Sequence, residues 1–286
     1  NTQTKLIEQL KENQRIRDEA NRQLEQKVKE RTKELFEEKQ KVEESHQRIK
    51  DSIIYARRIQ NALLPSEKAF GKYLPKHFIL YKPKDVVSGD FYYLKKVQNN
   101  LIIAVADCTG HGVPGAFVSM LGIAFLNEIV AKKQEKNAAR ILEDLRSLVK
   151  KSLQQTGSSS ETKDGMDMAL CIIDTHTNQL QFAGAYNPLY IIRKNELIQI
   201  KATRNPIGIY LREKPFKNNT FQLCTEDKLY MFSDGYTDQF GGKDDRKFLA
   251  KNFQKLLLEI AEKPMQEQKK ILNTVIENWK GGTNQN

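Results

Sequence analysis

The chain has 286 residues, of which 39% are hydrophobic and 29% are charged, and its net charge is +11 at pH 7. This length suits one large domain, or one domain with an extension. Lys and Arg are not gathered with aromatic residues in one stripe, so specific nucleic-acid binding is disfavoured and only weak, charge-driven binding stays open. The sequence shows no signal peptide and no apolar run near the ~18 residues that span a bilayer. The three scattered cysteines, Cys108, Cys171 and Cys224, indicate a reducing, cytoplasmic location.

The N-terminal 63 residues contain no Pro and no Gly, and they carry a seven-residue repeat. The "a" positions are mostly apolar: Ile7, Gln14, Asn21, Val28, Leu35, Val42, Ile49, Ala56 and Leu63. The "d" positions are mostly polar: Leu10, Arg17, Leu24, Arg31, Glu38, Ser45, Ser52 and Ile59. We therefore predict a weak coiled-coil helix over residues 1–64 that dimerises and transmits a signal, with Asn21 favouring one register. A single charged helix stabilised by i,i+4 pairs is the alternative.

The remaining elements are predicted from apolar patterns and from turn residues. In chain order they are loops and short strands over 67–100, a buried strand over 101–106, a helix from Pro114 to about Lys133, a helix over 137–155, a polar Ser-rich loop over 156–163, strands over 168–174, 179–183, 189–193, 197–200 and 228–232, and helices over 249–261 and 265–279. Strands with paired helices inserted between them favour an α+β fold with an antiparallel sheet over βαβ repeats. We predict that residues 65–286 form this domain.

Three acidic residues stand at strand ends or turns with glycine nearby. Asp90 follows Ser88 and Gly89, Asp107 ends one apolar strand, and Asp234 ends another. Carboxylates at the ends of buried strands are poorly solvated and repel one another, and a divalent cation relieves both costs. Hard oxygen ligands favour Mg²⁺ or Mn²⁺. Each Asp-Gly alone is explained equally well as a turn.

Five segments, VVSGDFYYL, VADCTGHGVPGAF, GAYNPLYIIR, NPIGI and LYMFSDGYTDQFGG, occur in one order. Together they resemble the bacterial metal-dependent protein serine/threonine phosphatases of the sporulation-E type, within the PPM superfamily, over about residues 52–280. SIIYARRIQNALLPS resembles the linker helix that precedes this domain in sensor phosphatases, and LEQKVKERTKEL resembles the coiled coil that follows sensor modules.

The resemblance implies an αββα sandwich with a site for two Mn²⁺ or Mg²⁺ ions and no organic cofactor. Carried over by position, Asp90 would bridge both ions, and Asp107 with the main-chain carbonyl of Cys108 would hold one of them. Asp234 would hold the other. Asp238 matches a position that supports a third metal or the substrate in some relatives, or else it is a helix-start acid. The implied reaction is metal-assisted hydrolysis of a phosphomonoester without a covalent intermediate.

The resemblance also implies partners and shows two departures. The expected substrate is a phosphorylated bacterial regulator such as an anti-sigma-factor antagonist, and a sensor domain is expected upstream in a longer protein. Cys108 stands where much of the superfamily has Gly. The family's last strand, preceded by an Asp-Asp pair, is not found, because Asp244 and Asp245 come before two further helices. An inactive pseudo-phosphatase that binds a partner as a dimer is therefore the alternative function.

Other catalytic patterns are weaker. Cys108 and His111 form half of a zinc motif without a second half. His111 is interpreted as a structural hydrogen-bonding residue in preference to a general acid. Ser88 and Ser233 have no visible His/Asp relay, which disfavours a serine nucleophile.

Overall fold

The computed structural model describes residues 2–132, 134–157, 163–282 and 285. The chain divides into two compact units, Asn1–Ile54 and Tyr55–Asn286.

The first unit is helical throughout and belongs to α1 (Thr2–Leu63), whose last nine residues lie in the second unit. Exposed ion pairs such as Arg31–Glu34 and Lys39–Glu43 support it. The apolar residues of the heptad repeat are exposed in the single chain: Ile7, Leu10, Leu24, Val28, Leu35, Val42 and Ile49. The predicted helix is confirmed, and its pairing with a second chain stays a prediction.

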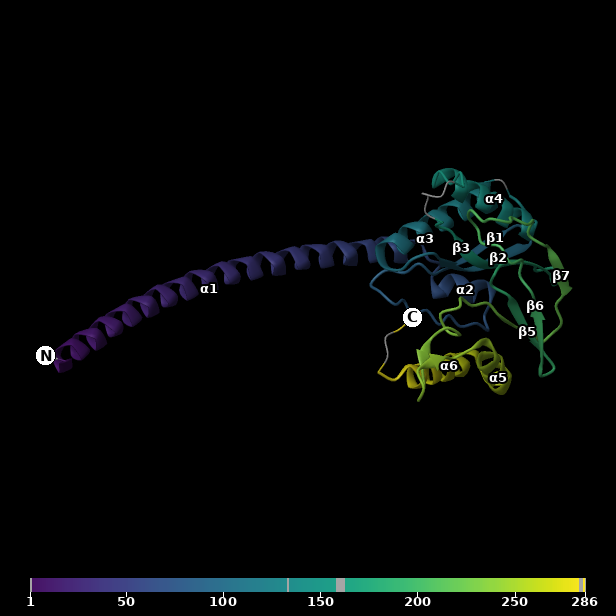
Figure 1. Ribbon diagram of the computed structural model, residues 1–286. Helices are drawn as coiled ribbons and strands as arrows, with labels where there is room; N and C mark the ends of the chain where they lie inside the picture. Colours follow the sequence, from purple (N-terminus) through teal and green to yellow (C-terminus); the bar gives the residue numbers. More distant parts are fainter. Residues whose placement is uncertain (1, 133, 158–162, 283–284, 286) are drawn as a thin grey trace. The chain divides into compact units, whose positions relative to one another are not determined.

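The second unit contains two antiparallel sheets (Figure 1). The first has the order β1-β2-β3-β4-β7, with β1 (Phe91–Val97), β2 (Asn100–Cys108), β3 (Met166–Asp174), β4 (Gln179–Ala185) and β7 (Asn219–Gln222). The second has the order β6-β5-β8, with β5 (Leu189–Arg193), β6 (Glu196–Ile200) and β8 (Lys228–Tyr230), and a short ribbon joins β9 (Phe240–Gly241) to β10 (Arg246–Lys247). All strand pairs are antiparallel, which confirms the predicted α+β class.

Helices cover the outer faces of both sheets, as Figure 1 shows. On one side are α3 (Gly112–Leu126), the π-helix η1 (Asn127–Lys132) and α4 (Ala138–Ser152); on the other are α5 (Ala250–Ile260) and α6 (Met265–Lys280). Alternate residues of β3 divide between two cores: Met168 and Leu170 pack toward α3 and α4, while Ala169 and Cys171 pack between the sheets. The layers are therefore helix, sheet, sheet, helix, as the resemblance implied.

Three local differences separate the structure from the sequence-based expectations. The short helix α2 (Glu67–Tyr73) lies in a segment predicted as loops and strands, and Ser66 Oγ caps it by accepting from the Ala69 amide at 3.2 Å. Pro114 is the third residue of its helix and not the first. β7 was not predicted. The centre of the predicted Ser-rich loop, 158–162, lies outside the described residues.

One helical stretch among the described residues, Gly112–Lys132, is apolar and long enough to cross a membrane by length and composition, and half of it is buried. The core helix of a folded domain passes the same test of length and composition, so this result does not overturn the expectation that the chain has no membrane segment. Ile123, Leu126 and Ile129 belong to the core against the first sheet, which explains why the stretch is apolar.

Candidate metal centre

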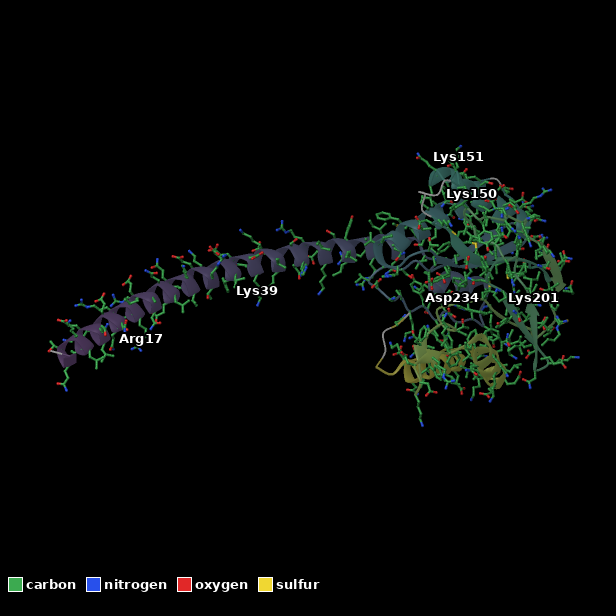
Figure 2. All side chains as sticks on the ribbon, viewed as in Figure 1. Arg17, Lys39, Lys150, Lys151, Lys201 and Asp234 are labelled. Atoms are coloured by element: carbon green, nitrogen blue, oxygen red, sulfur yellow. The ribbon has the colours of Figure 1, made fainter. Side chains whose placement is uncertain are left out.

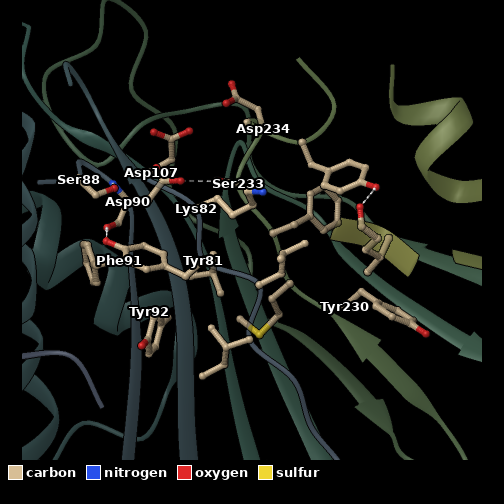
Figure 3. A pocket seen from close by; sticks show the side chains of 18 of the residues that line it. Tyr81, Lys82, Ser88, Asp90, Phe91, Tyr92, Asp107, Tyr230, Ser233 and Asp234 are labelled. Carbon is tan, nitrogen blue, oxygen red and sulfur yellow. Dashed lines mark hydrogen bonds between the residues drawn. The ribbon is translucent and has the colours of Figure 1, made fainter. Parts of the chain in front are cut away.

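The three predicted acidic residues come from adjoining strand ends. Asp90 immediately precedes β1 and Asp107 lies near the end of β2; because Phe91 pairs with Ala106, the two acids are neighbours at one edge. Asp234 lies beyond β8 of the second sheet. Figure 3 shows all three carboxylates gathered at one end of the same cavity. The structure thus brings together side chains that the sequence places up to 144 positions apart.

Asp167 is a fourth acid at this edge, and the sequence analysis missed it. It is the second residue of β3 and pairs directly with Asp107 across the strands. Burial, and then the charge of Asp234, raise its pKa to about 7. Alternation of polar and apolar residues along the strand would have indicated which side Asp167 faces. β3 has no such alternation, because it is buried on both faces and is almost continuously apolar.

Burial and mutual repulsion dominate the electrostatics of these acids. The pKa of Asp107 is raised to about 9, first by burial and then by the charges of Asp90 and Asp234. Burial also raises the pKa of Asp90, against a hydrogen bond from Ser233 that lowers it. A bound cation would stabilise the ionised forms and reverse these shifts.

Asp90 is held by contacts from three directions. The Ser233 hydroxyl donates to Asp90 Oδ2 at 2.8 Å, drawn as a dashed line in Figure 3, and so links the ends of the two sheets. The Asp90 amide donates to Ser88 Oγ at 3.0 Å, and the Tyr81 hydroxyl donates to the Asp90 carbonyl at 3.0 Å. Ser88 and Ser233 therefore orient a carboxylate, which agrees with the expectation that neither is a nucleophile.

Main-chain oxygens border the same place. A Cβ added at Gly89 would lie 2.8 Å from the Gly110 carbonyl oxygen and 3.0 Å from that of Cys108. A Cβ at Gly115 would lie 2.4 Å from the Gly110 carbonyl oxygen. Only glycine permits this approach of backbone to backbone. Burial raises the pKa of the Cys108 thiol, so its sulfur stays a protonated part of the core.

This donor set fits a hard divalent cation. Carboxylate and carbonyl oxygens are the ligands that Mg²⁺ and Mn²⁺ prefer, and the raised pKa values record repulsion that such an ion would remove. Among the described residues, no three His, Cys, Asp or Glu side chains already converge closely enough to enclose an ion. Asp234 is exposed, whereas Asp90 and Asp107 are partly buried (Figure 2).

A buried glutamine from the end of α1 supports the loop before Asp90. The Gln60 amide nitrogen donates to the Ser88 carbonyl at 2.6 Å and to Ser119 Oγ at 2.8 Å. The Ser88 amide donates back to Gln60 Oε1 at 3.0 Å. Gln60 is only 2% exposed, so these bonds are shielded from water. No local pattern in the sequence signals this contact.

Two other predicted residues lie at the margin. His111 Nδ1 is 2.8 Å from Asp85 Oδ2, and both side chains are largely exposed, so the expected hydrogen bond exists at the surface. Asp238 accepts from Lys247 Nζ at 2.5 Å, and its amide donates to the Asp234 carbonyl, one turn earlier. Neither contact decides between a helix-start acid and a position that supports a third metal or the substrate.

A cavity of about 560 Å³ extends inward from the acids within the second unit. It runs between the two sheets toward α6, and its deeper wall is apolar, with Phe78, Leu80, Tyr230 and Phe232. Tyr81, Tyr92 and Tyr230 line the part drawn in Figure 3.

The comparisons with known proteins agree with this architecture. The family model for stage II sporulation protein E (SpoIIE) matches residues 98–286. The chain belongs to the SpoIIE family. The SiaA-PP2C domain of Pseudomonas aeruginosa is 32% identical, with a TM-score of 0.76 over 84% of this chain and 94% of that one. A comparison with curated proteins gives no match.

Two more distant structures share the fold. The PP2C phosphatase domain of SpoIIE from Bacillus subtilis, with a fragment of its regulatory domain, is 19% identical, with a TM-score of 0.59 over 74% of this chain and 61% of that one. The RsbU and RsbW domains of Rv1364c from Mycobacterium tuberculosis are 20% identical, with a TM-score of 0.55 over 68% and 52%. This SpoIIE-family chain is thus a PP2C-type, metal-dependent protein phosphatase of bacterial signalling.

Proposed function

We propose that the chain hydrolyses phosphoserine and phosphothreonine in a bacterial regulatory protein, with two Mn²⁺ or Mg²⁺ ions at the acidic centre. The observation that carries this proposal is the gathering of Asp90, Asp107 and Asp234 from both sheets at one edge. Asp90, tied to both sheets, would contact both ions. Asp107 and the Cys108 carbonyl would hold one ion, and Asp234 the other; Asp238 would stay outside this set.

The chemistry supplied by bound Mn²⁺ or Mg²⁺ is a nucleophilic water at neutral pH and neutralisation of charge on the phosphoryl oxygens. The protein's own contribution is positional. Ser233 and Ser88 fix the orientation and backbone of Asp90 through bonds of 2.8 and 3.0 Å. Gly89 keeps the carbonyls of Cys108 and Gly110 free of a side chain that would cover them. A rigid ligand frame of this kind lowers the cost of reorganisation during reaction.

The test is hydrolysis of p-nitrophenyl phosphate and of a phosphoserine peptide as a function of Mn²⁺ concentration. Asp90→Asn, which retains an oxygen acceptor for Ser233, should reduce the rate about 100-fold or more and weaken Mn²⁺ binding measured by calorimetry. Asp244→Asn, the same change at an exposed acid that pairs with Arg246, is the control. Undiminished activity of Asp90→Asn would exclude this site.

The N-terminal helix is proposed to dimerise the protein and to transmit the state of an upstream sensor in the cytoplasm. Its exposed apolar seam supports pairing with a second copy, since such residues are stabilised by burial between helices. Its last turn carries Gln60, which contacts Ser88 two residues before Asp90. A change in the packing of this helix would therefore act through Gln60 on the loop of Ser88 and Gly89 that precedes Asp90, called the metal loop below. An anti-sigma-factor antagonist is the proposed substrate class.

A further inference from the structure

An exposed surface of two tyrosines and an arginine lies outside the residues used so far. The rings of Tyr186 and Tyr210 meet edge to face, with centroids 6.4 Å apart, and they are 38% and 43% exposed. Arg204 is exposed on the same loop as Tyr210, and it forms no salt bridge within the part of the chain that the structure describes. Tyr186, Arg204 and Tyr210 are called the tyrosine surface below.

The backbone places the tyrosine surface next to the acidic centre. Met168 pairs with Ala185, so the next residues outward, Asp167 and Tyr186, lie at the same edge of the sheet. Asp167 in turn pairs with Asp107. The Tyr186 amide donates to the Thr203 carbonyl at 3.0 Å, which fixes the loop with Arg204 beside it.

A second pair of bonds anchors the other end of this loop. Met166 and Ile207 exchange both backbone hydrogen bonds, at 3.0 and 2.8 Å. The loop from Thr203 to Ile207 is therefore attached at two points to the end of the first sheet where Asp167 lies. A substrate segment next to a phosphate at the acidic centre would lie directly over this loop.

The chemistry of the tyrosine surface suits an anionic and partly apolar ligand. Tyr186 has φ of 56°, in the left-handed region that non-glycine residues rarely adopt and that clusters at functional sites. The pKa of Tyr186 is raised to about 12, first by its hydrogen bond with Tyr210 and then by burial. Arg204 follows Thr203, whose carbonyl accepts from the Tyr186 amide, so the backbone brings the cation to this surface.

We propose that the tyrosine surface binds the substrate segment that flanks the phosphorylated residue. The rings of Tyr186 and Tyr210 take an apolar side chain, and Arg204 pairs with an acidic one. This inference rests on the proposed phosphatase function and adds a preference in substrate sequence. Its basis is complementarity and position: two partly exposed aromatic rings and a cation that has no ion-pair partner among the described residues lie at the sheet edge that carries Asp107 and Asp167.

The test compares two synthetic phosphoserine peptides that share one apolar residue and differ in neighbouring Glu or Lys. Arg204→Glu should lower kcat/KM for the Glu peptide about tenfold and raise it for the Lys peptide. Tyr210→Ala should lower kcat/KM for both peptides about fivefold. Hydrolysis of p-nitrophenyl phosphate, which has no flanking segment, should stay within about twofold. Lys151→Glu, an exposed residue on α4, is the matched charge control.

The outcomes separate this inference from the proposed function. Equal effects of Arg204→Glu and Lys151→Glu on the Glu peptide would overturn it, and so would a parallel loss with p-nitrophenyl phosphate. If the wild type hydrolyses neither substrate with Mn²⁺, the proposed function fails. The binding of the same peptides, labelled and followed by fluorescence anisotropy, then decides the inference: the Glu preference and its reversal by Arg204→Glu uphold it, and equal binding refutes it.

Discussion

The hydrogen bonds of Gln60 predict that the end of α1 fixes the position of the metal loop and so affects metal affinity. Gln60→Leu nearly preserves side-chain volume but removes three buried hydrogen bonds, two donated to Ser88 and Ser119 and one accepted from the Ser88 amide. The Ser88 carbonyl keeps a longer bond of 3.3 Å from Ser119 Oγ, whereas its amide loses the partner shown here. A buried amide left without a partner costs about 1–3 kcal/mol. We therefore expect the variant to unfold with a free energy lower by about 2 kcal/mol.

The functional effect follows from the next bond in the chain of contacts. Ser88 Oγ accepts from the Asp90 amide, so displacement of Ser88 shifts the carboxylate proposed to contact both ions. If the displacement of Ser88 weakens the binding of Mn²⁺ by about 1.4 kcal/mol, the Mn²⁺ concentration that gives the half-maximal rate rises about tenfold. The assay is p-nitrophenyl phosphate hydrolysis over a Mn²⁺ titration, with urea unfolding of the same samples.

The control for Gln60→Leu is Gln47→Leu. Gln47 lies on the exposed part of α1, where its amide donates to Asp51 at 2.9 Å, and the change should alter neither quantity. A Gln60→Leu protein that is less stable but has an unchanged Mn²⁺ titration would refute the coupling to Asp90. A protein unchanged in both would refute the importance of the network itself.

Three further predictions use other parts of the chain. Gly89→Ala puts a methyl group 2.8 Å from the Gly110 carbonyl oxygen and should weaken Mn²⁺ binding measured by calorimetry. Unaltered affinity would argue against a role of the Gly110 and Cys108 carbonyls at the metal centre. Val28→Asp changes an exposed "a" residue, so light scattering should show a monomer in place of a dimer while the helix content persists. A molecular mass equal to that of the wild type would exclude dimerisation through the apolar residues of the heptad repeat. The pKa of Asp227 is lowered, first by its hydrogen bond with Arg193, so this stabilisation is present above pH 3.8 and is lost as pH falls through the lower folded value. Asp227→Asn should thus cost about 1–3 kcal/mol of unfolding free energy at pH 7 and less at pH 3, whereas an equal cost at both pH values would contradict the direction of this shift.

The parts of the fold with strong local patterns could be predicted from sequence. The heptad repeat predicted α1, and an apolar run ended by an acid predicted β2 and placed Asp107 at its end. α2 could not be predicted in this way, because Gly71 and Pro75 in and beside it indicated loops. Its formation depends on the Ser66 cap and on burial of Phe70, which are a local and a tertiary contribution.

The candidate site shows the same division. Asp90 and Asp234 adjoin glycines and Asp107 ends an apolar run, and these local signals identified all three as candidates. Asp167 opens a strand that is buried on both faces, and its neighbours give no alternation from which to infer its direction. Gln60 lies 28 positions from Ser88, and only the packing of α1 against the loop joins them. Contacts between distant segments leave no periodic trace in a single sequence.

The distribution of contacts around Asp90 supports the proposal that α1 acts on the metal centre without a rearrangement of the sheets. Ser233 reaches Asp90 from 143 positions away and fixes its carboxylate to the second sheet. Ser88 fixes its amide, and Gln60 fixes Ser88. The first contact comes from the segment that follows β8, while the second belongs to a loop whose buried partner, Gln60, lies on α1. A rotation of the last turn of α1 would thus alter one of the two restraints on the carboxylate and leave the other in place, which is enough to change metal affinity while the fold is retained.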